Sequence, residues 1–267
     1  MSNVFRSLNL FGVLSLAGLS CGVLALAEDT PKKEAPQKDS ATAKTEAVKE
    51  SPKKEGAPAD KKWQPLFDGK TLTGWKVTEF GSGGEIEVEG DHILIGYGDG
   101  CTGLTWTKDF PKVDYEVLVE AQRVDGTDFF CGLTFPVQES PCSLIVGGWG
   151  GALVGLSSID GEDAAHNDTK QYLTFEKKKW YQIRLRVTKT HISAWIDDKR
   201  VILQGTTGHK LSIRPEVQKS LPFGICSWCT TAAVRKADVR KLTPEETKPE
   251  VEPAKDADKP TDKATDK

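Results

Sequence analysis

Several features that define large protein classes are missing from this 267-residue sequence. After Ala27, no segment is long and apolar enough for a transmembrane helix, which needs about 20 apolar residues. No helical periodicity lasts longer than a turn or two, which argues against a helical bundle. The sequence also has no glycine-rich nucleotide loop, no nucleophile elbow and no zinc-protease helix motif, and their absence argues against those enzyme classes.

A strong charge of one sign is missing as well. The formal net charge is -3 at pH 7 and the sequence pI is about 5.9. Lysine is interleaved with glutamate and aspartate in both terminal stretches, so neither is a polybasic arm. Nucleic acid is therefore not an expected partner.

The N-terminal segment has the order of a secretory signal peptide. Arg6 supplies the positive start, residues 8–19 are an apolar run, and Ala25-Leu26-Ala27 forms a small-x-small cleavage site. We expect cleavage after Ala27 and export to the periplasm or the cell exterior. The alternative is a lipoprotein anchored at Cys21, which follows a small serine.

Two stretches have too few apolar residues to fold. Residues 28–61 contain no aromatic residue and one branched aliphatic, Val48, and residues 244–267 have a similar composition of Lys, Glu, Asp, Thr and Pro. Such segments cannot bury enough apolar surface to offset the entropy of ordering. We predict disordered tails flanking one folded domain at residues 62–243, which is long enough for a single large core.

Short strands dominate the predicted domain. In residues 181–187, Tyr, Ile, Leu and Val alternate with Gln and Arg, which is the period of two of a half-buried strand. Short turns lead to strands at 192–196 and 201–203, which predicts an antiparallel meander. Many short strands in one domain indicate an all-β, two-sheet sandwich or jelly roll. Further strands are predicted at 93–95, 115–119, 129–135 and 143–146.

Five segments, taken together, resemble a family of bacterial secreted domains described as 3-keto-disaccharide hydrolases. Each segment is short, but their order and spacing are specific for the fold. The resemblance implies a concanavalin A-like jelly roll that cleaves 3-keto-glycosides by acid/base chemistry on a concave face. The segments are Leu66–Lys76 (LFDGKTLTGWK), Asp114–Val117 (DYEV), Trp180–Leu185 (WYQIRL), Ile192–Asp197 (ISAWID) and Leu221–Ile225 (LPFGI).

Three positions depart from the family pattern. Pro136 replaces the arginine of the family's SGIFFR strand, Val154 replaces an aromatic residue, and Cys142-Ser143-Leu144-Ile145 carries no acid where the family has E-x-Q-I. These losses favour a second hypothesis, a non-catalytic carbohydrate-binding or cell-surface interaction module. A third is a structural surface protein that its tails tether. One scaffold hosts many functions, so the resemblance alone does not decide among them.

An acidic loop at residues 157–168 is the best replacement for the lost site. Carboxylates can act as general acid and base, and a keto group at sugar C3 acidifies the C2 proton, so an elimination needs a base and an electrophile. We predict Asp160 and His166 for these roles, with Glu162 and Asn167 binding substrate. The alternatives are a calcium site, although the spacing fits no EF-hand, and an ordinary solvated loop.

Three tryptophans near glycines or strand ends, Trp106, Trp149 and Trp228, are candidates for stacking on a sugar ring. Trp149 is the strongest because it lies within a glycine run. Packing in the core is the competing explanation, since large aromatics dominate core burial. Asp128 is a rim acid and a third catalytic candidate. The sequence indicates no cofactor and no metal-ligand set, and we expect a carbohydrate or another extracytoplasmic ligand as partner.

Five cysteines remain after the predicted cleavage: Cys101, Cys131, Cys142, Cys226 and Cys229. An odd number leaves at least one thiol unpaired in a monomer. Cys226 and Cys229 have the C-x-x-C spacing of a redox motif, but they lie in a predicted strand and not at the start of a helix. No second pair completes a zinc site. We expect buried thiols, or one or two disulfides such as Cys131 with Cys142.

Overall fold

The computed structural model describes residues 62–248. The predicted signal peptide, Cys21, the predicted N-terminal tail and most of the C-terminal one lie outside these residues. Within them the elements are strands, apart from a 3-10 turn, η1, at Pro215–Ser220. Residues 62–248 contain no helix that is long and apolar enough to cross a membrane.

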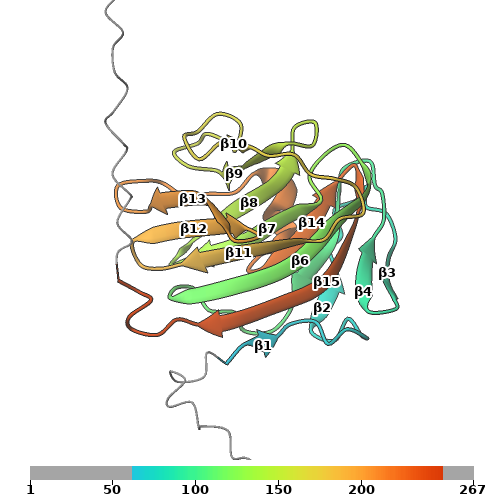
Figure 1. Cartoon of the computed structure of the whole chain (residues 1–267), viewed down its shortest axis with the longest axis horizontal. Coiled ribbons are helices and arrows are strands. Elements are labelled where there is room, and N and C mark those ends of the chain that lie inside the picture. The colour runs from blue at the N-terminus through green and yellow to red at the C-terminus, as the bar shows by residue number, and fades with distance from the viewer. Residues whose placement is uncertain (1–61, 249–267) are drawn as a thin grey trace, which may run out of the picture. The chain divides into compact units, whose positions relative to one another are not determined.

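Two antiparallel sheets pack face to face as a jelly-roll sandwich, which confirms the predicted all-β fold (Figure 1). Sheet A has the order β13-β12-β11-β6-β15-β4-β3, and β1 also pairs with β15. Its strands are β1 (Gln64–Pro65), β3 (Ile86–Glu89), β4 (His92–Ile95), β6 (Tyr115–Gly126), β11 (Tyr181–Val187), β12 (His191–Ile196), β13 (Lys199–Gly205) and β15 (Thr230–Lys241).

Sheet B has the order β10-β9-β8-β7-β14-β5-β2. Its strands are β2 (Trp75–Val77), β5 (Cys101–Trp106), β7 (Cys131–Val137), β8 (Ser140–Gly148), β9 (Leu153–Ser157), β10 (Gln171–Tyr172) and β14 (Gly224–Trp228). Figure 1 shows β7, β8 and β14 behind β11, β6 and β15.

The predicted meander is present as β11, β12 and β13. Along β11 buried and half-buried residues alternate strictly, as the period of two predicts. The inner face of this strand meets the inner face of sheet B in the main core, where Phe130, Leu133 and Phe135 are fully buried.

Sheet B buries side chains on its outer face too. A second apolar cluster there includes Cys101, Phe129, Ile145 and Cys226, with Trp228 packed against it. Two glycines make room for it: a Cβ at Gly103 would lie 2.5 Å from Cys226 Cβ, and one at Gly132 would lie 2.9 Å from the Phe129 ring. The outer face of sheet B thus carries an apolar cluster that packs close to its backbone.

Two connecting loops are fastened to each other over this outer face. Ser158 N donates to Ser212 O at 2.7 Å and Ser212 N donates to Ser158 O at 3.0 Å, while Asp160 N donates to Lys210 O at 2.8 Å. These backbone hydrogen bonds join the acidic loop after β9 to the connection before η1.

The five described cysteines are free thiols. On the β7–β8 ladder Cys131 lies opposite Val146 and Cys142 opposite Phe135, four positions along the strand. At about 3.3 Å per residue this offset is too long for a disulfide, so the suggested Cys131–Cys142 bond is wrong. Cys229 is in the turn after β14, at φ 42°.

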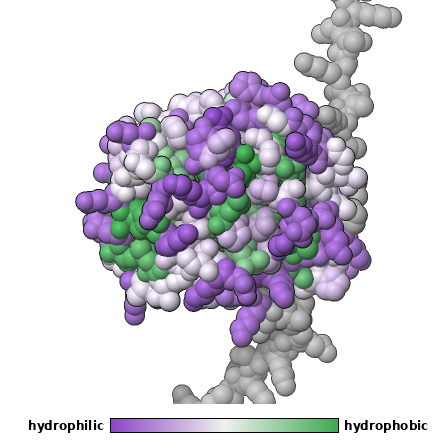
Figure 2. Space-filling view, turned by 180° about the vertical axis from the view of Figure 1, so that it is seen from behind, coloured by the Kyte–Doolittle hydropathy of each residue, from purple (hydrophilic) through white to green (hydrophobic). Residues whose placement is uncertain are grey.

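Figure 2 shows the side opposite to that of Figure 1. Apolar residues lie there in separate areas between polar ones. The described part of this side thus has no broad apolar patch of the kind that marks a large protein interface.

Candidate functional site

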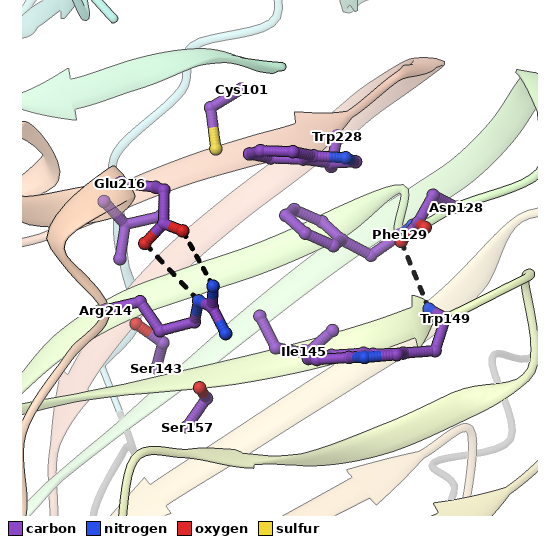
Figure 3. Close-up of a pocket in the computed structure, with 11 residues that line it drawn as sticks. Cys101, Asp128, Phe129, Ser143, Ile145, Trp149, Ser157, Arg214, Glu216 and Trp228 are labelled. Carbon is purple, nitrogen blue, oxygen red and sulfur yellow. Dashed lines mark hydrogen bonds and ion pairs between the residues drawn. The ribbon is translucent and has the colours of Figure 1, made fainter. Parts of the chain in front are cut away.

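A cavity of about 230 Å³ opens on the outer face of sheet B. Its wall is built from β5, β8, β9 and β14, from the turns before β7 and after β8, and from the segment that begins η1. We call it the aromatic cavity, because two indole rings and a phenyl ring form one side of it (Figure 3).

The aromatic side consists of Trp149, Trp228 and Phe129. The two indoles lie on either side of the Phe129 ring (Figure 3), and the Phe129 and Trp228 ring centroids are 6.4 Å apart. Trp149 is 43% exposed and has a φ of 47°. An exposed aromatic face at the mouth of a pocket is suited to an apolar ring face of a ligand.

Asp128 fixes the position of Trp149. Asp128 Oδ1 accepts hydrogen bonds from Phe129 N at 2.7 Å and from Trp149 N at 3.2 Å. Within residues 62–248 no hydrogen bond reaches Oδ2 of the same carboxylate. One oxygen therefore builds the loop, and the other is available to a ligand.

Buried Arg123 stabilises the same loops through hydrogen bonds to their main chain. Its guanidinium donates to four main-chain oxygens, those of Asp128 (3.1 Å), Gly147 (3.0 Å), Gly151 (2.9 Å) and Phe175 (3.3 Å). These bonds fix both ends of the glycine run that carries Trp149.

Opposite the aromatic side, Arg214 and Glu216 form an ion pair. Arg214 Nη2 donates to Glu216 Oε1 at 2.7 Å, and Arg214 Nη1 donates to Asp163 Oδ2 at 3.0 Å. The hydrogen bond from Arg214 lowers the pKa of Glu216. Glu216 is therefore a carboxylate at neutral pH.

Asp163 links this ion pair to the acidic loop. Its Oδ1 lies 2.6 Å from His166 Nδ1. Partial burial favours the neutral form of Asp163, but hydrogen bonds from His166 and the Ala165 amide outweigh burial and lower its pKa. Asp163 therefore stays ionised as well.

Two serines on adjacent strands lie near the ion pair (Figure 3). Ser143 on β8 pairs with Ser157 on β9, and both line the cavity. Ser143 is in the segment where the family carries an acid. The carboxylates of this cavity come instead from the turn before β7 and from η1.

A second, polar cavity of about 410 Å³ adjoins the first through Arg214, which lines both. His166, Glu162 and Asp163 also line this polar cavity. Within residues 62–248 no three His, Cys, Asp or Glu side chains gather as metal ligands. The calcium alternative for the acidic loop thus has no such cluster to support it.

The predicted site residues separate into three groups. Asp128, Trp149 and Trp228 line the aromatic cavity, and His166 and Glu162 line the polar cavity. The remaining three, Asp160, Asn167 and Trp106, line neither cavity.

Two of the remaining three have structural contacts in the loops. Asp160 binds Lys210 N through Oδ1 at 2.7 Å and lies 2.6 Å from His209 Nδ1 through Oδ2. Asn167 Nδ2 donates to three main-chain oxygens, and its Oδ1 accepts from Thr169 N and Oγ1. These bonds hold the loops together, which does not fit the catalytic and substrate-binding roles that we predicted.

Trp106 does not fit its predicted role as a sugar-stacking residue. It is buried in the main core between the sheets, 5.2 Å from the Trp75 ring. Its strand, β5, is buried on both faces, so the neighbouring glycine marks close packing and not exposure.

Sequence reasoning missed Arg214, Glu216 and the part that Ser157 plays. Arg214 and Glu216 flank Pro215 in a connection without strand periodicity, and no motif marks them. The position of Ser157 beside them depends on loops about 50 residues apart in the chain.

Among solved structures, the chain is similar to the Crh5 transglycosylase in complex with NAG, at 14% identity and a TM-score of 0.49, over 68% of this chain and 85% of that one. It is also similar to the carbohydrate-binding module CBM66 from Bacillus subtilis, at 17% identity and a TM-score of 0.44, over 63% and 96% of the two chains. A search of curated proteins finds no match. The model of the 3-keto-alpha-glucoside-1,2-lyase-like domain matches residues 62–240, and this chain belongs to that family.

Proposed function

We propose that this protein binds a 3-keto-glycoside in the aromatic cavity and cleaves its glycosidic bond. One observation carries the proposal: the exposed Trp149 ring, the available oxygen of Asp128 and the guanidinium of Arg214 belong to residues that line one cavity. Family membership supplies the carbohydrate class. The proposal also includes export, which rests on the signal-peptide pattern before Glu28.

The cavity suits one sugar ring. Its volume of about 230 Å³ is below the ~300–1,000 Å³ of pockets for drug-sized ligands. In our proposal an apolar face of the ring stacks on Trp149, and Phe129 and Trp228 extend the aromatic side beyond it. The ring oxygens then face Asp128 and the ion pair.

The cleavage that fits these groups is an elimination. The C3 ketone acidifies the C2 proton, which Asp128 takes as general base, and the electron pair forms an enolate at O3 that Arg214 stabilises. The enolate collapses, C1=C2 forms, the C1–O bond breaks, and the leaving oxygen takes the proton from Asp128. Addition of water across C1=C2 would complete a net hydrolysis.

These roles differ from those predicted from sequence. Asp128 takes the base role given to Asp160, and Arg214 takes the electrophile role given to His166. Glu216 orients Arg214 and is no general acid, because its lowered pKa keeps it ionised.

A non-catalytic carbohydrate-binding module remains the second candidate. The observation that favours it is the state of Glu216. Asp128 and Glu216 are the two acidic residues that line the aromatic cavity, and Glu216 is already paired with Arg214. A sugar could bind there without being protonated.

The test is to incubate the purified full chain with 3-keto-trehalose and follow both released glucose and the ultraviolet absorbance of a conjugated enone. Asp128→Asn keeps an acceptor for Phe129 N and Trp149 N but removes the base, so we expect a loss of about 100-fold or more. Asp160→Asn is the matched control and should retain full activity. Binding of the sugar without its cleavage, if Trp149→Ala abolishes that binding, would favour the binding module. The absence of both cleavage and binding would overturn the proposal.

A further inference from the structure

We propose that Ser157 is a specificity residue that hydrogen-bonds an uncharged oxygen of the sugar at the inner end of the aromatic cavity. This inference rests on the proposed function, since it assigns an atom of the same ligand to a side chain of the same cavity. No motif in the sequence marks this serine for such a role.

The first observation is an unpartnered hydroxyl. Ser157 is 1% exposed and lines the cavity, and its Oγ is buried without a hydrogen-bond partner in residues 62–248. In Figure 3 this oxygen points toward the Arg214 side of the cavity. Buried polar groups are nearly always hydrogen-bonded in proteins, so an exception at a cavity wall is a hydroxyl that a bound molecule can pair with.

The second observation is the contrast with its neighbour. Ser143 lies directly opposite Ser157 on β8, and its Oγ lies 3.2 Å from Thr134 Oγ1. The fold thus satisfies one of two adjacent hydroxyls and leaves the other open. Ser157 Oγ has no hydrogen-bond partner in residues 62–248 that corresponds to Thr134.

The charge of the surroundings selects the kind of oxygen. Arg214 is balanced by Glu216 and Asp163, and Asp128 adds a further carboxylate to the cavity. A carboxylate, sulfate or phosphate on the sugar would meet more negative than positive charge. A hydroxyl or keto oxygen avoids this repulsion and can accept from Ser157 or donate to it.

Ser220 offers a matched control. It is also 1% exposed, and its Oγ is also buried without a partner in the described residues. However, Ser220 is at the end of η1 and lines neither cavity. Replacing either serine by alanine removes the same buried hydroxyl, but only one replacement should change ligand binding.

The experiment compares Ser157→Ala, Ser220→Ala and Trp149→Ala in the full chain, each combined with Asp128→Asn to slow cleavage, by calorimetric titration with 3-keto-trehalose and by thermal unfolding. We expect Ser157→Ala to weaken binding by about 3- to 10-fold, the effect of one hydrogen bond, with a Tm that is unchanged or raised. Ser220→Ala should bind as Asp128→Asn alone does. A glucuronide of the same linkage should bind at least about tenfold more weakly than the neutral glycoside.

Three outcomes would overturn the inference. Ser157→Ala could bind as tightly as Asp128→Asn alone while Trp149→Ala loses binding, in which case the proposed function stands without it. A loss of affinity with a lowered Tm would show a structural role. No binding by the folded wild type would remove the proposed function and this inference together.

Discussion

At the scale of single residues, the tryptophans show how burial decides between packing and recognition. Trp106 and Trp149 both lie near glycines in the sequence, but β5 has a neighbouring strand on each side and packs on both faces. Trp149 follows the last residue of β8, where the left-handed backbone turns its ring outward. The same residue type therefore has opposite roles.

This contrast gives a paired prediction. Trp149→Ala should weaken sugar binding by about tenfold or more, because the stacked aromatic face is lost, and should leave the free energy of unfolding nearly unchanged. Trp106→Ala should destabilise the domain by about 3–5 kcal/mol, as loss of a buried aromatic does. Urea unfolding followed by circular dichroism, beside titration of the folded variants, measures both. Equal destabilisation by the two changes would contradict this assignment.

At the scale of elements, the site depends on two loops that stabilise each other. The pairing of residues 158–160 with 210–212 brings Arg214 to Asp163 across the surface of sheet B. Asn167 ties the acidic loop to β9 through Leu156 O, at 2.8 Å. The loops therefore position the polar half of the aromatic cavity.

Asn167→Asp should loosen this arrangement. The change keeps an acceptor for Thr169 but removes the amide that donates to Leu156 O, Glu162 O and Asp163 O. We expect a loss of about 1–3 kcal/mol, since partly buried acceptors are left unpaired, and faster amide hydrogen exchange in residues 157–170. Thr247→Val is a control on an exposed hydroxyl that bonds only Pro244 O. Unchanged exchange in the loop would refute the role given to Asn167.

The carboxylates of these loops predict a response to acid. Asp163 and Glu216 have lowered pKa values in the folded state, so their contribution is present above the unfolded pKa values and is lost as pH falls through the folded ones. The unfolded values are near 4.5 for Glu216 and 3.8 for Asp163. Tm should therefore fall below about pH 4.5, and less steeply in a Glu216→Gln, Asp163→Asn double variant. Parallel Tm–pH curves for both proteins would contradict this.

Features that depend on residues close together in the sequence could be predicted, and features that depend on residues far apart in the sequence could not. The β11–β13 meander follows from alternation and turns within residues 181–203, so local pattern suffices. Arg214 and Glu216 become part of a site only when the fold brings Arg214 to partners such as Asp163, which is 51 positions away in the sequence. Asp128 and Trp149 were found because glycines and an aromatic pair mark their turns, whereas Ser157 has no local mark.

At the scale of the whole molecule, the two outer faces of the sandwich differ. On sheet A, buried Glu116 accepts from Arg186 at 2.8 Å and from Arg240 at 3.1 Å, and the Arg184 guanidinium lies 3.9 Å from the Trp195 ring centroid. These paired groups fill that face. The outer face of sheet B carries the aromatic cavity instead, so the candidate site lies there.

The distribution of thiols over the molecule gives the last prediction. Burial raises the pKa of Cys142 to about 12, and it also raises the pKa of Cys131, so at pH 8 these stay protonated as well as covered. Cys229 alone among the described thiols is partly exposed. Ellman's reagent on the native protein should therefore show a fast reaction that Cys229→Ser removes and Cys142→Ser leaves unchanged. The buried thiols should react only at the rate of unfolding, because the thiolate is the attacking species and needs access to the reagent. A fast reaction that survives Cys229→Ser and disappears in Cys142→Ser would mean that sheet B opens around β8, and the cavity could then not be the rigid site described above.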